Sequence, residues 1–346
     1  MDTRTDARRS PGPARLLPAL VMAWILVGAC SSESSSPGSS PLPLHPVAEI
    51  DLPENNSCFD YASLAPSGDC CSLPTSAPAR SSKSTSAPGR SSERSRTCPR
   101  HGVLVVPERR RVYVTATADN RLVILDEDTA AVIGQAPTGN YPDGIAYHPK
   151  RGTVWTTNES GGSEPVVDAT TAQVRGTVDL GGEVGNIAYA PVANQILVAV
   201  QGKGDLAAIA PETLDVARRL PTPGCLGLGF GFGFGPSARL AFVACADNAT
   251  LLTIDLAIWQ TAGTTAVGEQ PDVLAYNQGE QRLYVAAENG IVSVYDQRDR
   301  HLTDVGSGHL ADGAHVVVDP SIGHTYYPDR AGTDGHPALL EQAPSP

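Results

Sequence analysis

The feature that most constrains the fold is a repeat of about 42 residues that runs from residue 101 to the end of the chain. Each copy has an aromatic or bulky marker residue and a closing residue. The markers are Tyr113, Trp155, Leu197, Phe242, Tyr284 and Tyr326, and the closing residues are Pro107, Pro149, Pro191, Pro236, Gln278 and Pro320. Both series advance in steps of 42, 42, 45, 42 and 42 residues. Two independent markers with the same spacing indicate a structural repeat.

Each copy holds four short segments of alternating or continuous apolar residues, separated by turn residues. In the second copy these segments are GIAYH, TVWTT, PVVDA and VRGTVDL. Segments of this kind predict strands and no helix. A unit of four strands that recurs about every 40 to 45 residues is typical of a β-propeller. The 34 glycines and 29 prolines supply the turns that such a fold needs.

A further copy lies ahead of residue 101, because CFDYASLAP ends at Pro66, 41 residues before Pro107. The sequence therefore predicts a seven-bladed β-propeller. Residues 70–100 are rich in Ser, Pro and Arg, so we expect disorder there and a first blade that is degenerate after its inner strand. Two origins stay open: a pair of compensating frameshifts, since a shifted reading with G+C-rich codons restores the repeat pattern, or a genuine insertion.

The two ends of the repeat region complement each other. VAEIDL, residues 47–52, resembles a fourth strand with no other strand of its blade before it, and the last copy ends after its third strand. We expect residues 47–52 to complete the last blade and close the ring, which removes two exposed sheet edges.

The first 44 residues have the composition of a targeting segment and a tether. Residues 1–29 carry basic residues followed by LLPALVMAWILVGA, which predicts a secretory signal peptide. The VGA before Cys30 resembles a bacterial lipobox, so Cys30 is the predicted lipidation site; an ordinary signal peptide is the alternative. Residues 30–44 predict a flexible Ser/Pro tether, and residues 45–346 the propeller. This predicts an exported protein, lipid-anchored to the outer face of the bacterial cytoplasmic membrane in the cell envelope.

The segments VYVTATADNRLVILDEDTAAVI and LYVAAENGIVSVYDQR, with PDGIAYHP and PDVLAYNQ, resemble YVTN-type β-propeller repeats of the YncE-like kind. The resemblance covers residues 45–346 and implies the fold rather than a chemistry. The GH and WD dipeptides of WD40 repeats do not recur in register. Some YncE-like proteins are linked with DNA, but a net charge of −12 repels a polyanion, so we predict no nucleic-acid partner.

Two of the seven cysteines suit a disulfide. Cys225 precedes an innermost strand, and Cys245 ends the strand that returns beside it. In an exported protein we expect these two residues to form a bridge, with two free thiols as the alternative.

The candidate ligand residues lie in the loops that enter the innermost strands and in those that join second strands to third strands, which open on the same face. The main candidates are His101, Asp143, Asn158, Glu159, Asn186, Asp272, Asp312 and His315, and the second set of loops adds Glu164, Gln201, Asp205, Asp247, Asn248, Glu288 and Asn289. An oxygen-rich set suits Ca²⁺ or Mg²⁺ better than zinc. The alternative is that these residues only cap turns.

Three classes of function are compatible with these features. We expect a monomeric, non-catalytic binding module that recognises a small ligand or an envelope protein at the channel mouth and touches the membrane only through its lipid. The first alternative is a metal-dependent hydrolase or lactonase-like propeller enzyme. The acidic and histidine residues at the strand starts would supply its site. The second is a structural role, or an inactive product of a damaged gene.

Overall fold

The structure is a computed structural model that describes residues 40–52, 62–64, 70–72, 102–235, 239–313 and 315–345, with the side chains of 70–72 and 228–235 left out. All of these described residues belong to one compact unit. The predicted signal peptide and Cys30 lie outside the described residues, as does most of the predicted tether. Among the residues described, no helix is both long and apolar enough to cross a bilayer.

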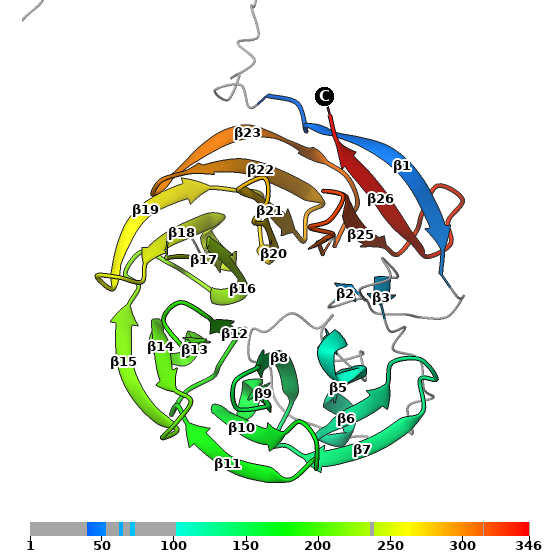
Figure 1. The fold of residues 1–346 in the computed structure, drawn as a ribbon. Helices are drawn as coiled ribbons and strands as arrows, with labels where there is room; N and C mark the ends of the chain where they lie inside the picture. Colours follow the sequence, from blue (N-terminus) through cyan, green and yellow to red (C-terminus); the bar gives the residue numbers. More distant parts are fainter. Residues whose placement is uncertain are drawn as a thin grey trace, which may run out of the picture. The chain divides into compact units, whose positions relative to one another are not determined.

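The described chain forms six four-stranded antiparallel sheets, which follow one another around a ring (Figure 1). The first sheet contains β4 (Val103–Val106), β5 (Arg111–Ala116), β6 (Arg121–Asp126) and β7 (Val132–Pro137). The second contains β8 (Pro142–His148), β9 (Thr153–Asn158), β10 (Ser163–Asp168) and β11 (Val174–Asp179). The third contains β12 (Ile187–Ala190), β13 (Gln195–Val200), β14 (Asp205–Ala210) and β15 (Asp215–Pro221). The fourth sheet contains β16 (Leu228–Gly235), β17 (Leu240–Cys245), β18 (Thr250–Asp255) and β19 (Gln260–Ala266). The fifth contains β20 (Pro271–Asn277), β21 (Arg282–Ala287), β22 (Ile291–Arg298) and β23 (His301–His309). The sixth contains β24 (Val317–Val318), β25 (Thr325–Asp329), β26 (Ala338–Pro344) and β1 (Leu44–Asp51). We call these sheets blades 1 to 6.

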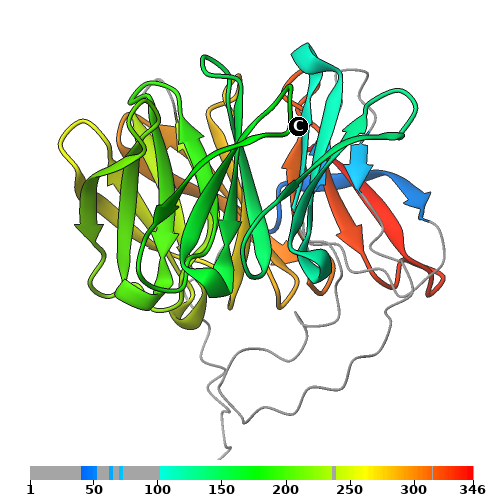
Figure 2. The same cartoon turned by 90° about the horizontal axis from the view of Figure 1, so that it is seen from below.

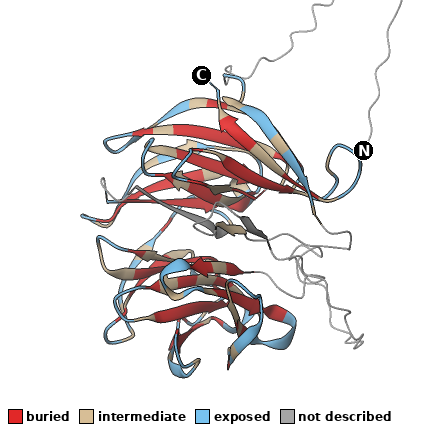
Figure 3. Cartoon of the chain, turned by 45° about the vertical axis from the view of Figure 1, so that its right-hand side comes forward, coloured by how far each residue is buried: buried red, intermediate tan, exposed pale blue. Residues whose placement is uncertain are grey.

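The burial of each strand follows its place in the blade. The second strands β9 and β17 are buried at every position, whereas the outermost strand β11 is mostly exposed. In Figure 3, buried residues accordingly lie along the strands and exposed ones along the loops and outer edges. Trp155 in blade 2 is fully buried and packs in one cluster with Ile196 and Val198 of blade 3. The core is therefore a series of interfaces between blades, because each blade covers the face of the next.

Short 3-10 turns recur in the loops between second and third strands (Figure 2). They are η3 (Thr117–Asp119), η4 (Glu159–Gly161), η5 (Gln201–Lys203) and η7 (Ala246–Asn248), and a further turn, η2 (Pro107–Arg109), joins β4 to β5. Each ends on a left-handed residue, for example Asn120 at φ 52° and Gly162 at φ 63°. Asparagine and glycine tolerate positive φ best, so the repeat of turn residues in the sequence becomes a repeat of loop geometry.

The predicted closure of the ring is confirmed. Strand β1 pairs antiparallel with β26, and its register runs from Leu44 opposite Pro344 to Asp51 opposite Ala338. The strand is displaced toward the N-terminus relative to the predicted range 47–52. It supplies the fourth strand of blade 6, so the last strand of the chain is not left as an open sheet edge.

The predicted count of seven blades is wrong, because the described chain forms six. Among the described residues, the additional copy contributes a two-stranded sheet of β2 (Ala62–Leu64) and β3 (Cys70–Ser72), which contacts β4 and β24. The backbone N–H of Val105 donates a hydrogen bond to Ser63 Oγ at 3.0 Å, which ties this sheet to blade 1. Two three-residue strands bury too little apolar surface to form a blade. Residues 70–72 belong to this sheet and not to a disordered segment, and residues 73–100 lie outside the described residues.

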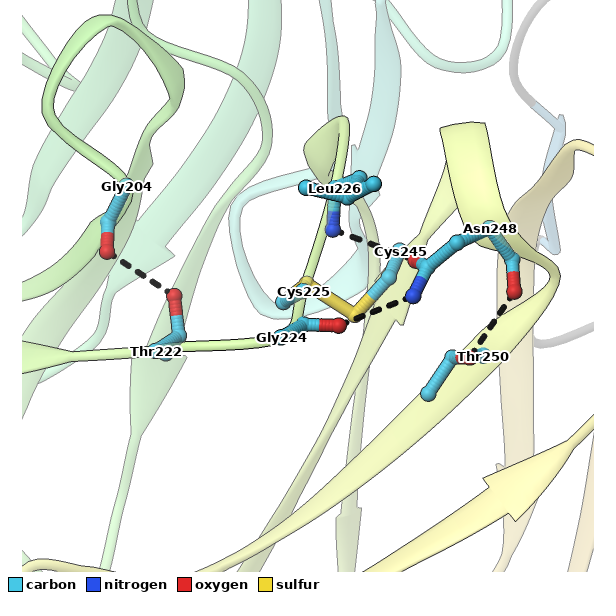
Figure 4. Close-up of a disulfide and its surroundings, with 8 residues drawn as sticks. All are labelled: Gly204, Thr222, Gly224, Cys225, Leu226, Cys245, Asn248 and Thr250. Carbon is cyan, nitrogen blue, oxygen red and sulfur yellow. Dashed lines mark hydrogen bonds between the residues drawn. A yellow bond between two sulfur atoms is a disulfide. The ribbon is translucent and has the colours of Figure 1, made fainter.

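Cys225 and Cys245 are joined by a disulfide, with 5.2 Å between their Cα atoms (Figure 4). Asn248 fastens the same loop, because its side chain accepts a hydrogen bond from Leu226 N–H at 3.1 Å and donates one to Gly224 O at 2.8 Å. The bridge spans 20 residues, and a closed loop of that length stabilises a fold by about 3 kcal/mol in the loop-entropy estimate. It anchors the segment that enters β16.

Deletion of residues 44–51 is expected to lower the melting temperature markedly, because blade 6 loses its outer strand and exposes the edge of β26. Thermal unfolding followed by circular dichroism measures the effect. Deletion of residues 31–38, ahead of the first described residue, is the matched control and is expected to change little. Equal melting temperatures for the two deletions would contradict the closure by β1.

Candidate functional site

The strongest candidate site is a cluster of Asp272, Glu288 and His315 between blades 5 and 6. His315 Nε2 lies 2.7 Å from Asp272 Oδ2 and 3.6 Å from Glu288 Oε1. One donor atom from each side chain lies within 4.8 Å of the other two. The histidine is 2% exposed, whereas the Asp272 and Glu288 side chains are 15% and 36% exposed. The cluster therefore opens to solvent through its carboxylates.

The blade topology explains why these residues meet. Asp272 is the second residue of β20, Glu288 directly follows β21, and His315 lies just before β24. In an antiparallel pair the start of one strand lies beside the end of the next, and Pro271 is indeed paired with Ala287. The first strand of the next blade then brings His315 to the same end.

The backbone holds the two carboxylates in place. A register shift between Pro271 and Leu274 forms a bulge at Asp272, and a bulge re-aims the side chain that it contains. The N–H of Glu288 donates to Gln270 O at 2.9 Å, and the carbonyl of Glu288 accepts from Gly313 N–H at 2.8 Å. Gln270, the residue directly before β20, has a left-handed backbone conformation with φ 57°.

The charges of the cluster favour a cation. Two carboxylates within 4.8 Å of each other repel each other by at least about 3 kcal/mol at the effective dielectric constant of a protein surface. A protonated His315 would balance one of these charges, and a divalent ion would balance both. Carboxylates suit Mg²⁺, Ca²⁺ and Mn²⁺, and an imidazole adds affinity for Mn²⁺ or Zn²⁺. The residues thus fit a divalent metal site with a mixed oxygen and nitrogen donor set.

Arg330 is a neighbour that the sequence analysis missed. Glu288 Oε2 and Arg330 Cζ lie 3.4 and 3.9 Å from the point where a Cβ on Gly313 would be. Arg330 is exposed, and it follows Glu288 by one repeat step of 42 residues. Alignment of whole repeats, rather than of acidic residues alone, is the signal that would have found it. An exposed guanidinium beside a cation site favours an anionic or hydroxylated ligand.

Asp143, Glu159 and Asn186 lie in the corresponding loops of blades 2 and 3. Asp143 is the second residue of β8, Glu159 is the first residue of η4, and Asn186 directly precedes β12. The carbonyl of Asp143 accepts a hydrogen bond from Thr115 Oγ1 at 2.8 Å. Asn186 is 7% exposed. These residues are three blades away from the His315 cluster, so they do not join it.

Two predicted site residues have other surroundings. Asn158 is 2% exposed, and its side chain accepts a hydrogen bond from Gly139 N–H at 2.8 Å and donates one to Ser163 Oγ at 3.0 Å. Asp312 is 86% exposed and lies 2.8 Å from His309 Nε2. Asn158 thus holds a turn, and Asp312 forms a surface pair. His101 lies outside the described residues.

Glu164 is an unusual residue in a blade interface. It is fully buried, on the same face of β10 as Val166, which packs against blade 3. The residues at this place in blades 1, 3 and 4 are Leu122, Leu206 and Leu251. Burial raises the pKa of the Glu164 carboxyl well above its ordinary value of 4.5, and the Thr157 hydroxyl beside it offsets this only in part. No donor among the described residues reaches either carboxyl oxygen in normal hydrogen-bond geometry.

Many solved structures share this fold. A chain of a mitotic checkpoint complex aligns with a TM-score of 0.67 at 12% identity, covering 95% of this chain and 100% of that one. Streptogramin B lyase aligns with a TM-score of 0.63 at 11% identity, covering 85% and 96%. Hydrazine synthase of Kuenenia stuttgartiensis aligns with a TM-score of 0.56 at 14% identity, covering 71% and 87%. At these identities the likeness establishes the β-propeller fold and no more.

The comparisons do not decide the finer resemblance. No known family and no curated protein matches this sequence, so membership of the YncE-like group stays a prediction. The similar structures include a lyase and a component of a multiprotein complex. The fold therefore does not choose between catalysis and binding.

Replacement of Glu164 by leucine is expected to stabilise the protein at pH 8. The folded state holds the Glu164 proton more tightly than the unfolded chain does, so stability is unaffected well below pH 4.5 and falls as the pH rises toward the raised pKa. Glu164→Leu should flatten this decline and add about 1 to 3 kcal/mol at pH 8, the usual cost of an unsatisfied buried polar group. Urea unfolding between pH 5 and 8 in the presence of a chelator measures it. Glu108→Gln, at an exposed site, is the control; a Glu164→Leu profile that matches wild type would refute the assignment.

Proposed function

We propose that the protein is an exported, lipid-anchored binding module that uses a divalent cation at Asp272, Glu288 and His315 to bind a small oxygen-rich ligand. The observation that carries the proposal is the convergence of three ligand-type side chains from two blades, with donor atoms within 4.8 Å of one another. Carboxylates are costly to gather unless a cation neutralises them.

The surroundings of the cluster favour a ligand of a particular chemistry. Glu288 Oε2 and Arg330 Cζ lie within 4 Å of the same point beside Gly313, so we expect the guanidinium to reach a group bound on the cation. A carboxylate or a pair of hydroxyl oxygens could then coordinate the ion and accept hydrogen bonds from the guanidinium. The net charge of −12 argues against a polyanion, so we propose a small acid or sugar-like polyol.

Catalysis is the second candidate function, and the same cluster motivates it. A divalent ion held by two carboxylates and one imidazole could polarise a carbonyl or lower the pKa of a water, as in a metal-dependent hydrolase. The two functions separate on one measurement. A binding module retains the candidate acid, lactone or polyol unchanged, and an enzyme converts it.

The site is tested by titrating metal ions into the full-length protein after chelator treatment. Isothermal titration calorimetry with Mn²⁺, Zn²⁺, Mg²⁺ and Ca²⁺ should include a site whose affinity falls on the order of 100-fold in both Asp272→Asn and His315→Ala. Asp312→Asn, which alters an exposed carboxylate beside a different histidine, is the matched control. Retention of wild-type affinity for all four ions in both site variants would rule the cation site out.

The proposed anchor is tested separately. Cys30→Ala should move the protein from the membrane fraction to the soluble fraction, or leave its leader uncleaved, because the lipid would have no thiol to join. Fractionation of cells that express each form measures this. Cys58→Ala is the control for loss of a thiol as such. A membrane fraction unchanged by Cys30→Ala would exclude lipidation at Cys30.

A further inference from the structure

Each member of the cluster has a counterpart three repeats earlier in the chain. Asp143 precedes Asp272, Glu159 precedes Glu288, and Asn186 precedes His315, in each case by the same 129 residues. In the other blades the residues at the places of Asp143 and Glu159 are not acidic: they are His101 and Thr117, Gly185 and Gln201, Phe230 and Ala246, and Ala314 and Arg330. The acidic pair is thus confined to blades 2 and 5.

The backbone around the two sets is the same. Tyr141, like Gln270, has a left-handed φ, at 60°. The N–H of Glu159 donates to Tyr141 O at 2.9 Å, and the carbonyl of Glu159 accepts from Val184 N–H at 3.2 Å. A register shift between Pro142 and Ile145 forms a bulge at Asp143. Each of these features repeats what holds Asp272 and Glu288, so the loops of blade 2 present Asp143 and Glu159 in the same way.

Buried polar atoms without partners lie directly behind this second set. Thr157 is fully buried, and its Oγ1 has no hydrogen-bond partner of normal geometry in the described structure. Thr157 Oγ1 and Asn186 Oδ1 lie 2.9 and 3.3 Å from the point where a Cβ on Gly144 would be. Both oxygens therefore lie against the Asp143–Gly144 segment, with Ile187 Cγ2 3.2 Å from the same point. Glu164 lies opposite Thr157, because Ser163 pairs with Asn158 and Val166 pairs with Trp155 in the same two strands.

An unsatisfied hydroxyl in a dry interface carries a desolvation cost that no hydrogen bond offsets. The cost is removed if a ligand takes the lone pairs of Thr157 Oγ1 while its hydrogen turns to Glu164. An asparagine oxygen, a threonine oxygen and two carboxylates are all hard oxygen donors. This is the donor set that Ca²⁺ prefers, because it takes six to eight oxygen ligands in flexible geometry.

We infer that the protein carries a second cation site, for Ca²⁺, formed by Asp143, Glu159 and Asn186 with the Thr157 hydroxyl behind them. It lies between blades 2 and 3, three blades along the ring from the His315 cluster, and it shares no residue with that cluster. The two sites differ in chemistry, since His315 gives the first one a nitrogen ligand and Asn186 gives the second one an oxygen. The inference does not depend on the function proposed for the first site.

The test is a Ca²⁺ titration of the full-length, chelator-treated protein by isothermal titration calorimetry. The variant Asp272→Asn/His315→Ala, which lacks the first site, should still bind one Ca²⁺. Adding Asp143→Asn to it should weaken that binding at least tenfold, and adding Glu159→Gln should do the same. Adding Asp119→Asn, an exposed carboxylate in the equivalent loop of blade 1, should leave the binding unchanged.

Several outcomes would overturn the second site. They are the absence of Ca²⁺ binding once Asp272 and His315 are changed, affinity unaffected by both Asp143→Asn and Glu159→Gln, and equal loss in the Asp119→Asn control. Melting temperatures measured without Ca²⁺ show whether each variant folds, and Glu159→Gln keeps the test valid if Asp143→Asn does not. Loss of Mn²⁺ or Zn²⁺ binding in Asp272→Asn reports on the first site alone, so the two proposals fail independently.

Discussion

The structure depends on the fact that a single blade cannot bury its own two faces. Its second strand is buried on both sides, as strands β9 and β17 demonstrate, and it is covered only when a blade stands on each side of it. Every blade therefore relies on its neighbours, and the series of interfaces has to end somewhere. Blade 6 meets this requirement by taking β1 from the other end of the chain, which links residues about 290 positions apart.

The same dependence brings the candidate ligands together. His315 belongs to the entry of blade 6, and its partners Asp272 and Glu288 belong to blade 5. The 2.7 Å contact of His315 with Asp272 exists only because the two blades pack with a fixed rotation. A site of this kind is as rigid as the apolar interface beneath it, which includes Tyr284 and Val294 of blade 5 and Tyr327 of blade 6.

The repeat also allows individual blades to diverge without loss of the fold. The loop backbone that presents Glu288 is reproduced around Glu159, yet the third member of the set changes from histidine to asparagine. Glu164 stands in a buried interface where blades 1, 3 and 4 have a leucine, and the disulfide of Cys225 and Cys245 occurs in blade 4. Uniform backbone geometry and local side-chain substitution together give each inter-blade interface its own chemistry.

The sequence by itself determined the all-β propeller architecture, because the 42-residue spacing and the turn residues are local properties that repeat along the chain. It also determined the closure of the ring, since an unmatched strand at one end and a missing strand at the other can both be recognised in the sequence. The number of blades was decided by tertiary structure: the copy whose first strand ends at Pro66 has the right spacing, but its described residues pair only as β2 and β3. The site was decided in the same way. Asp312 and His315 are three residues apart, yet His315 is buried against Asp272 while Asp312 faces solvent beside His309. Spacing places a residue in a loop, but only the packing of one blade on the next decides which loop residues meet.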